Sequence, residues 1–124
     1  MSFRMVSVAA LAALVMTACG SVTSGPDTPG ETVVAAMQLI RDGKPEEFKR
    51  LVVADDQMDA SMFSGVYSSG WSSEGGLEHV EVASEEINGN SATVEAAFHF
   101  ANGNTEKVTY KLRQEDGVWK IVLP

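Results

Sequence analysis

The stretch Ser91-Ala92-Thr93-Val94-Glu95-Ala96-Ala97-Phe98-His99-Phe100 decides the fold, because an apolar residue occupies every second position. A period of two places alternate side chains on the same face of a β-strand. The even-numbered positions are therefore expected to point into a core, and the polar Thr93, Glu95 and His99 away from it. One buried face and one polar face are typical of an antiparallel sheet.

The alternation continues on both sides of this stretch, and a glycine-containing turn separates the runs. The later runs are Val108, Tyr110, Leu112 and then Trp119, Ile121, Leu123. An earlier run, from Leu77 toward Ile87, slips out of alternation, which predicts a β-bulge. The turns are Asn88-Gly89-Asn90, Asn102-Gly103-Asn104 and Glu115-Asp116-Gly117. The sequence thus predicts a four-strand antiparallel meander.

Helix signals precede the strands. Thr28-Pro29-Gly30-Glu31 is a capping box with proline at the first helical position, and this helix is expected to end at Asp42-Gly43. Lys44-Pro45-Glu46-Glu47 begins a second, shorter helix, and a third is predicted over residues 56–64. Residues 67–76 are rich in Ser and Gly, which predicts a loop.

Helices followed by strands indicate an α+β fold, with N-terminal helices packed on one face of a curved antiparallel four-strand meander. Three motifs in this order resemble small bacterial envelope lipoproteins with a cystatin-like or nuclear-transport-factor-2-like (NTF2-like) domain. The motifs are Thr28-Pro29-Gly30-Glu31, Asp42-Gly43-Lys44-Pro45-Glu46-Glu47-Phe48 and Gly117-Val118-Trp119-Lys120-Ile121. The resemblance runs from Thr28 to Leu123 and implies one cone-shaped domain over residues 28–124.

The resemblance also implies a conical pocket between a strongly curved sheet and the helices. In superfamily enzymes such as ketosteroid isomerase and scytalone dehydratase, an acid or a histidine transfers protons in that pocket. Other members bind a ligand there or fill the pocket with side chains. The fold by itself therefore does not settle the function.

Residues 1–18 are similar to a lipoprotein signal peptide, because Met5 to Met16 is apolar except for Ser7 and Met16-Thr17-Ala18-Cys19 resembles a lipobox. The apolar segment is shorter than the roughly 20 residues that cross a bilayer. Cys19 would then carry acyl chains such as palmitate, and residues 19–27 would form the lipidated cysteine and a flexible tether. The alternative is an ordinary cleaved signal with an incidental cysteine.

Lipidation of Cys19 would anchor the protein to a membrane of the cell envelope, facing the periplasm or the cell surface. In a Gram-negative cell the resemblance implies the outer membrane, because Gly20 rather than aspartate follows the cysteine. The net charge of −8 argues against nucleic acid as a partner, since its phosphates would repel the protein.

The candidates for proton-transfer chemistry are Glu106, Tyr110 and His79. Glu106 is in phase with Tyr110, so both side chains are expected on the core side of one strand. A carboxylate in an apolar pocket has a raised pKa and can act as a base, while a tyrosine hydroxyl stabilises an oxyanion. The simpler alternative is that Glu106 and His79 lie in water near strand ends.

The candidates for contact with a ligand or partner are Tyr67, Trp71, Met58 and Met62. Aromatic residues in a loop at the mouth of a cone can recognise ligands or proteins. Methionines supply adaptable apolar contacts. Alternatively, the two aromatic rings close over the core and the methionines belong to it.

No metal ion or cofactor is expected. Two histidines and one lipidated cysteine do not complete a tetrahedral zinc site of the usual kind. Asp55, Asp56 and Asp59 do not match a calcium-binding loop, and Asp55 or Asp56 is expected to cap a helix.

These observations favour a non-enzymatic, lipid-anchored envelope protein that binds a small apolar ligand or another envelope protein. The first alternative is an enzyme of isomerase or dehydratase type, with Glu106 or His79 buried beside Tyr110. The second is a structural module that forms a homodimer through the polar sheet face, made of Thr93, Glu95, His99 and Thr109.

Replacing Cys19 by alanine tests the predicted anchor. Without the thiol no acyl chain can be attached, so Cys19→Ala should be soluble or keep its signal peptide, and should take up no labelled palmitate. Membrane fractionation of cells grown with labelled palmitate measures both properties, with the unsubstituted chain as the reference. A Cys19→Ala protein that stays membrane-bound and labelled would show that the lipobox interpretation is wrong.

Overall fold

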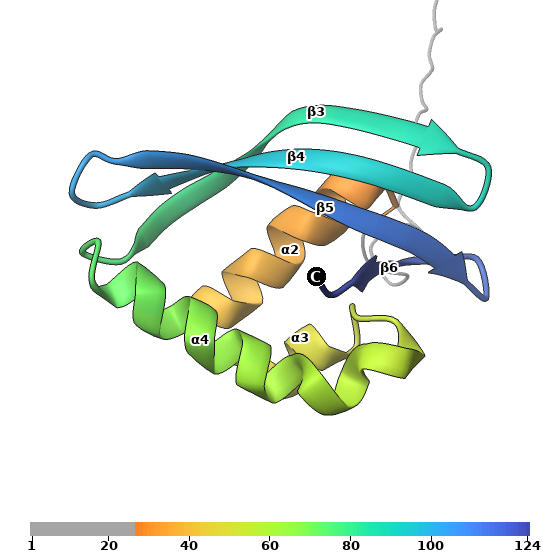
Figure 1. The fold of residues 1–124 in the computed structure, drawn as a ribbon, viewed down its shortest axis with the longest axis horizontal. Coiled ribbons are helices and arrows are strands. Elements are labelled where there is room, and N and C mark those ends of the chain that lie inside the picture. The colour runs from red at the N-terminus through yellow and green to blue at the C-terminus, as the bar shows by residue number, and fades with distance from the viewer. Residues whose placement is uncertain (1–26) are drawn as a thin grey trace, which may run out of the picture.

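The computed structural model describes residues 27–124, and these form helices followed by a four-stranded sheet (Figure 1). The elements are α2 (Pro29–Arg41), α3 (Pro45–Lys49), the 3-10 helix η3 (Ala54–Asp59), α4 (Ala60–Ser72), β3 (Leu77–Asn88), β4 (Ser91–Phe100), β5 (Thr105–Glu115) and β6 (Val118–Val122). The predicted α+β order is confirmed. Cys19, the predicted signal peptide and nearly all of the tether lie outside the described residues.

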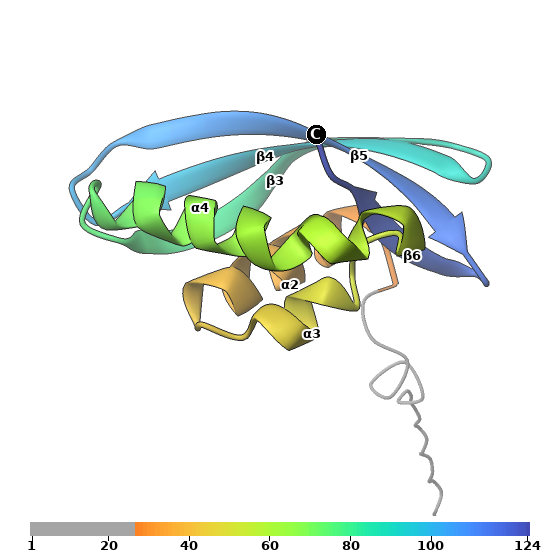
Figure 2. The same cartoon turned by 60° about the horizontal axis from the view of Figure 1, so that its bottom comes forward.

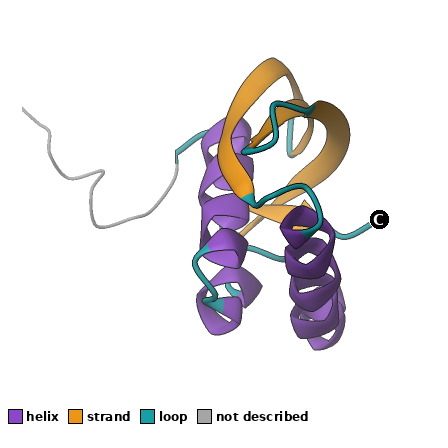
Figure 3. Cartoon of the chain, turned by 90° about the vertical axis from the view of Figure 1, so that its left-hand side faces the viewer, coloured by secondary structure: helices purple, strands orange, loops and turns teal. Residues whose placement is uncertain are grey.

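The sheet is an antiparallel meander in the order β3-β4-β5-β6, as predicted. Figure 3 shows the strongly curved sheet on one side of the molecule and the helices on the other. The alternate residues of β4 that were expected to be buried, from Ala92 to Phe100, all lie in the core. They pack with Val33, Met37 and Ile40 of α2. We call the helix-facing side of the sheet its inner face and the opposite side its outer face.

The pairing of β3 with β4 shifts at two points. The shift between Val82 and Ser84 is the predicted bulge, and it lets Val82 and Glu85 both face inward, opposite Ala96 and Val94. The second shift, between Leu77 and His79, was not predicted. Because Leu77 faces inward, an unbroken strand would turn His79 inward too, and the shift instead turns it to the outer face.

The start of α2 is stabilised by a hydrogen bond from β3 as well as by its own N-cap. Thr28 accepts a hydrogen bond from the Glu31 amide at 3.1 Å, as the capping box predicts. The Glu31 carboxylate accepts from the Asp27 amide rather than from Thr28, so only half of the box forms as predicted. The Gly30 amide donates to the Glu85 carboxylate at 2.6 Å, which places a negative charge at the positive end of the helix.

The prediction of a loop over residues 67–76 is wrong for residues 67–72, because α4 continues to Ser72, and only residues 73–76 form a connection to β3. The third helix was predicted over residues 56–64, but the chain forms η3 first and α4 begins at Ala60. Serine and glycine are weak helix formers. The aromatic residues of α4 recur at a spacing of four and pack against the core, and this packing outweighs the low propensity. Figure 2 shows α4 running lengthwise below the sheet.

The predicted helix capping by Asp55 or Asp56 is also wrong. Neither side chain caps η3. Asp56 accepts a hydrogen bond from the Leu123 amide at 3.0 Å, and Asp55 forms an ion pair with Arg113 at 3.2 Å. Both acids therefore tie the start of η3 to the last strands of the sheet.

The last strand is held on both sides. On one side β6 pairs with residues 111–115 of β5. On the other, the Ile121 amide donates to Leu51 and the Val53 amide donates to Ile121, at 2.7 and 2.9 Å. Within residues 27–124 no helix combines the length and apolar character that crossing a membrane requires.

Gly30→Ala tests the contact between α2 and β3. An added Cβ would lie 2.9 Å from both the Glu85 carboxylate and a Val82 methyl group, so the carboxylate must leave the Gly30 amide. We expect the free energy of unfolding, measured by urea denaturation, to fall by about 1–3 kcal/mol.

Gly65→Ala is the matched control on α4, because nothing lies within 4 Å of its added Cβ. It should stabilise the protein by about 0.5–1 kcal/mol through higher helix propensity. If both substitutions changed stability in the same direction and by the same amount, the proposed contact would carry no energy.

Candidate functional site

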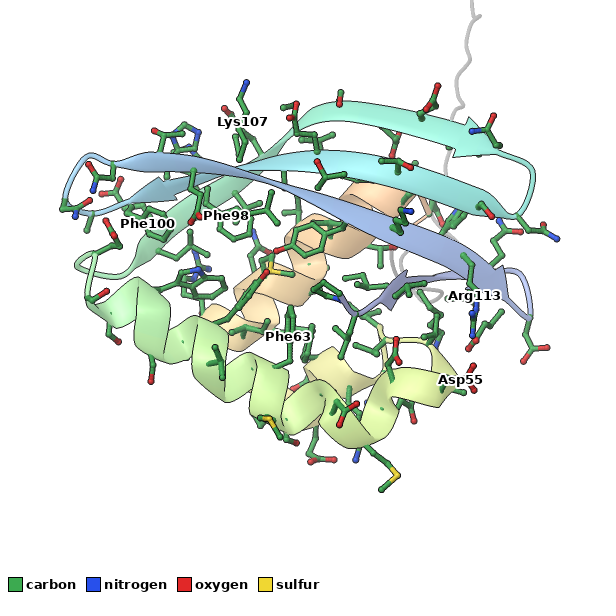
Figure 4. All side chains as sticks on the ribbon, in the orientation of Figure 1. Asp55, Phe63, Phe98, Phe100, Lys107 and Arg113 are labelled. Atoms are coloured by element: carbon green, nitrogen blue, oxygen red, sulfur yellow. The ribbon has the colours of Figure 1, made fainter. Side chains whose placement is uncertain are left out.

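An aromatic row on α4 faces the sheet. Phe63, Tyr67 and Trp71 follow one another at intervals of four, so they share one face of the helix. The ring centroids of Phe63 and Tyr67 are 4.2 Å apart, and those of Tyr67 and Trp71 are 5.5 Å apart. Trp71 also contacts Phe98 of β4 edge to face at 5.8 Å. In Figure 4, Phe63 and Phe98 both point into the space between α4 and the sheet.

Two tyrosine hydroxyls meet at the centre of this row. The Tyr67 and Tyr110 oxygens lie 2.9 Å apart, and the Tyr110 hydroxyl also lies 3.8 Å from the sulfur of Met37. Burial raises the pKa of Tyr110, and its hydrogen bond to Tyr67 raises that pKa further. Burial also raises the pKa of Tyr67. Both groups are therefore neutral phenols at physiological pH, able to donate a hydrogen bond but not to act as bases.

The space between the sheet and α2 is filled by side chains. Phe98 and Tyr110 are each 1% exposed, and Met37 is 0% exposed. The conical pocket that the resemblance implies is thus occupied by the protein's own core at these residues. The hollows beside the aromatic row lie at the surface, along α4.

Two adjoining hollows lie along α4, one between the helix and the residues that follow β6, the other between the helix and strands β4 and β5. The larger has a volume of about 380 Å³ and the smaller about 270 Å³, and both are lined by Val66 and Tyr67. We call the two together the α4 groove. The larger hollow is completed by Asp56, Asp59, Met62, Phe63, Leu123 and Pro124. The smaller is completed by Gly70, Trp71, Glu74, Phe100, Glu106 and Val108.

Of the predicted catalytic residues, only Glu106 and Tyr110 lie on the same face of the sheet. Glu106 shares the inner face with Tyr110, as predicted, and it lines the smaller hollow, but its side chain is exposed. His79 is exposed on the outer face, on the other side of the sheet from Tyr110. The desolvated acid or histidine that the enzyme hypothesis requires is therefore not formed by Glu106 or His79.

The predicted contact residues divide into three groups. Tyr67 and Met62 line the α4 groove, and Met62 is 70% exposed. Trp71 belongs mainly to the core and reaches the groove with one edge. Met58 is 95% exposed on η3 and lines neither hollow.

The predicted dimer surface is one continuous face. Thr93, Glu95 and His99 share the outer face of β4, and Glu95 pairs with Thr109 of β5. The prediction that this face forms a homodimer remains a prediction.

Sequence reasoning missed a cluster on the outer face. The ring centroids of His79 and His99 are stacked at 4.3 Å, and His99 Nε2 lies 3.0 Å from a carboxylate oxygen of Glu81. The expectation of no zinc site counted only histidine and cysteine as ligands and so overlooked Glu81. The register shift after Leu77, which brings His79 opposite His99, carries no obvious signal in the sequence.

The chain has an NTF2-like α+β fold. No protein-family model and no curated protein matches the sequence. An NTF2-like protein from Campylobacter jejuni, named as a candidate transpeptidase, superposes with a TM-score of 0.68 at 14% identity, over 77% of this chain and 98% of that chain. A de novo designed NTF2 fold protein gives a TM-score of 0.54 at 19% identity, over 76% of this chain and 81% of that chain.

A third structure, of a SEC-C motif containing protein from Rhodopseudomonas palustris, gives a TM-score of 0.59 at 15% identity, over 83% of this chain and 81% of that chain. At these identities the similarity concerns the fold alone. The name transpeptidase belongs to the Campylobacter protein and does not transfer an activity to this chain.

The raised tyrosine pKa values predict a loss of stability in alkali. The unfolded phenol ionises near pH 10, whereas the buried phenol resists ionisation, so folding is disfavoured as the pH rises above about 10. In Tyr110→Phe this dependence should weaken by up to about 1.4 kcal/mol per pH unit. Urea denaturation between pH 9 and pH 11 measures it.

Tyr67→Phe is the control, because it removes the same hydrogen bond but leaves the more deeply buried phenol in place. The slope of stability against pH should change less than in Tyr110→Phe. Parallel curves for Tyr110→Phe and the unsubstituted protein would contradict the proposed burial of this hydroxyl.

Proposed function

We propose that this protein is a lipid-anchored, non-catalytic interaction module of the bacterial cell envelope that binds an extended segment of a partner protein in its α4 groove. The observation that carries the proposal is an apolar groove beside an unpaired strand edge. The motif Met16-Thr17-Ala18-Cys19 supports the anchor, although Cys19 lies outside the described residues.

The edge arises because β6 is short. It pairs only with residues 111–115 of β5, and β4 covers the whole opposite side of residues 105–113. Among residues 27–124, no strand pairs with residues 105–110 on the β6 side. An unpaired edge offers backbone donors and acceptors to an added strand, which is a common way to bind an extended peptide.

The groove supplies apolar contacts next to that edge. Val66 and Met62 of α4 are 63% and 70% exposed, which is unusual for large apolar side chains on the same helical face. Glu106 and Val108 of β5 line the opposite side. A strand laid along the edge would direct every second side chain toward α4, so the segment should carry apolar residues at alternate positions.

The charges at the groove indicate which residues the bound segment should carry between its apolar positions. Asp56 and Asp59 lie at the larger hollow, and Glu74 and Glu106 at the smaller. The chain as a whole has a net charge of −8. Complementary charge favours a partner whose remaining residues are basic, and it disfavours anionic ligands such as fatty acids.

An extended segment fits this groove better than a small apolar ligand does. Small-molecule pockets usually enclose some 70–90% of the ligand surface. Here both hollows are open to solvent, and the enclosed interior is filled by Phe98 and Tyr110. The proton-transfer alternative has no support from the positions of Glu106 and His79.

A peptide of alternating valine and lysine is the probe for this proposal. Its control is a peptide of the same composition with the valines and lysines in two blocks. The full chain is reconstituted in phosphatidylcholine nanodiscs, and binding is followed by tryptophan emission, since Trp71 borders the groove. The alternating peptide should bind at least about tenfold more tightly, a difference of about 1.4 kcal/mol.

Val66→Lys should weaken binding of the alternating peptide at least about tenfold, because it places a cation in the apolar floor. Met58→Lys adds the same charge on an exposed residue outside the groove and should change affinity less than about twofold.

Hydrogen exchange should slow in residues 105–110 on binding. Equal binding of both peptides, or equal effects of both substitutions, would overturn the proposal. Fluorescence of neutral N-phenylnaphthylamine that exceeds its fluorescence in empty nanodiscs, without either peptide, would favour the small-ligand alternative.

A further inference from the structure

The outer face of the sheet brings together three side chains that can ligate a metal ion. His79 and Glu81 are two residues apart on β3, and His99 lies opposite His79 on β4. One ligand atom from each side chain lies within 4.8 Å of the other two. The two imidazole rings are nearly parallel, at 13°, and His99 Nε2 is 3.0 Å from Glu81 Oε1.

The ligand types select a class of metal. Two imidazole nitrogens and one carboxylate oxygen suit borderline divalent ions such as Zn²⁺, Cu²⁺ and Ni²⁺, whereas Mg²⁺ and Ca²⁺ prefer oxygen ligands throughout. Ligand atoms about 2.0–2.2 Å from one Zn²⁺ ion lie roughly 3–4 Å from each other. The 3.0 Å between His99 Nε2 and Glu81 Oε1 already falls in this range, and coordination of one ion requires the stacked imidazole rings to turn until both nitrogen lone pairs point at it.

Burial in the core does not explain why these residues meet. His79 and Glu81 are exposed, and the side chain of His99 is 30% exposed, so none is part of the core. The register shift between Leu77 and His79 is what turns His79 outward to face His99. Bulges that redirect a side chain in this way are over-represented beside functional sites.

We propose that His79, Glu81 and His99 bind one divalent transition-metal ion, with Zn²⁺ and Cu²⁺ as the favoured ions. The three protein ligands leave at least one coordination position open to solvent, available to water or to a ligand group from another molecule. The net charge of −8 raises the local concentration of cations. The site is separate from the α4 groove, because it lies on the opposite face of the sheet and shares no residue with the groove.

Metal titration of the tag-free full chain in phosphatidylcholine nanodiscs tests the site, with empty nanodiscs as the blank. After removal of metal with EDTA and dialysis, calorimetry should show one Zn²⁺ per chain. The substitutions His79→Gln, His99→Gln and Glu81→Gln should each weaken Zn²⁺ binding at least about tenfold. Glu86→Gln, which removes another exposed acid from the same face of β3, should change the affinity less than about twofold.

The electron paramagnetic resonance spectrum of bound Cu²⁺ reports the ligands directly. The unsubstituted chain should show coupling to two imidazole nitrogens, and each histidine variant should show coupling to one. Because all three side chains reach solvent, the variants should keep the far-ultraviolet circular dichroism spectrum and melting temperature of the parent. Equal Zn²⁺ affinity in the parent and the histidine variants, or binding by the parent no tighter than by empty nanodiscs, would overturn the proposal.

Discussion

The two register shifts in β3 set which side chains meet on each face of the sheet. Between the shifts, Val80 and Val82 point inward against Phe98 and Ala96. Beyond the shift between Val82 and Ser84, Glu85 also points inward, and its carboxylate reaches the Gly30 amide at the start of α2. A strand without this shift would direct Glu85 to the outer face and leave the helix start without that partner. The extra residue in β3 thus supplies a hydrogen bond to the start of α2, beside the core packing of Val33, Met37 and Ile40.

The core that forms on the inner face explains why the proposed binding surface is placed outside the cone. Tyr110 and Phe98 occupy the middle of the curved sheet, and α4 covers them with Tyr67 and Trp71. Because these rings fill the interior, a partner on the helix side of the sheet meets the margin of α4 and the adjoining edge of β5 rather than a cavity inside the cone. The same NTF2-like fold can enclose a pocket or fill it, and here the aromatic row on α4 decides between the two.

Local patterns predicted the sheet well because burial on one face imposes a strict alternation. The alternation of Ala92 to Phe100 predicted β4, and the slip in alternation before Ile87 predicted a bulge. The loop prediction failed at residues 67–72 because residue composition reflects only the intrinsic helix propensity. Contacts with distant strands stabilise α4 there, and composition does not report them. The histidine pair was missed for a related reason. Placing His79 opposite His99 requires the pairing register, which depends on contacts along the whole of β3 and β4.

The acidic side chains beside the unpaired edge of β5 affect which kind of chain can pair with it. An unpaired edge can in general pair with the same edge of a second copy, which is how edge strands cause aggregation. In this chain a second copy would bring its own Glu106 and Glu74 toward the acidic groove, and like charges placed face to face destabilise such a pair. A basic segment would be attracted by the same carboxylates. The acidic margin therefore disfavours pairing of two copies along β5 and favours a basic extended segment. A second copy and a basic segment would use the same backbone groups of β5, so the side-chain charges alone distinguish them.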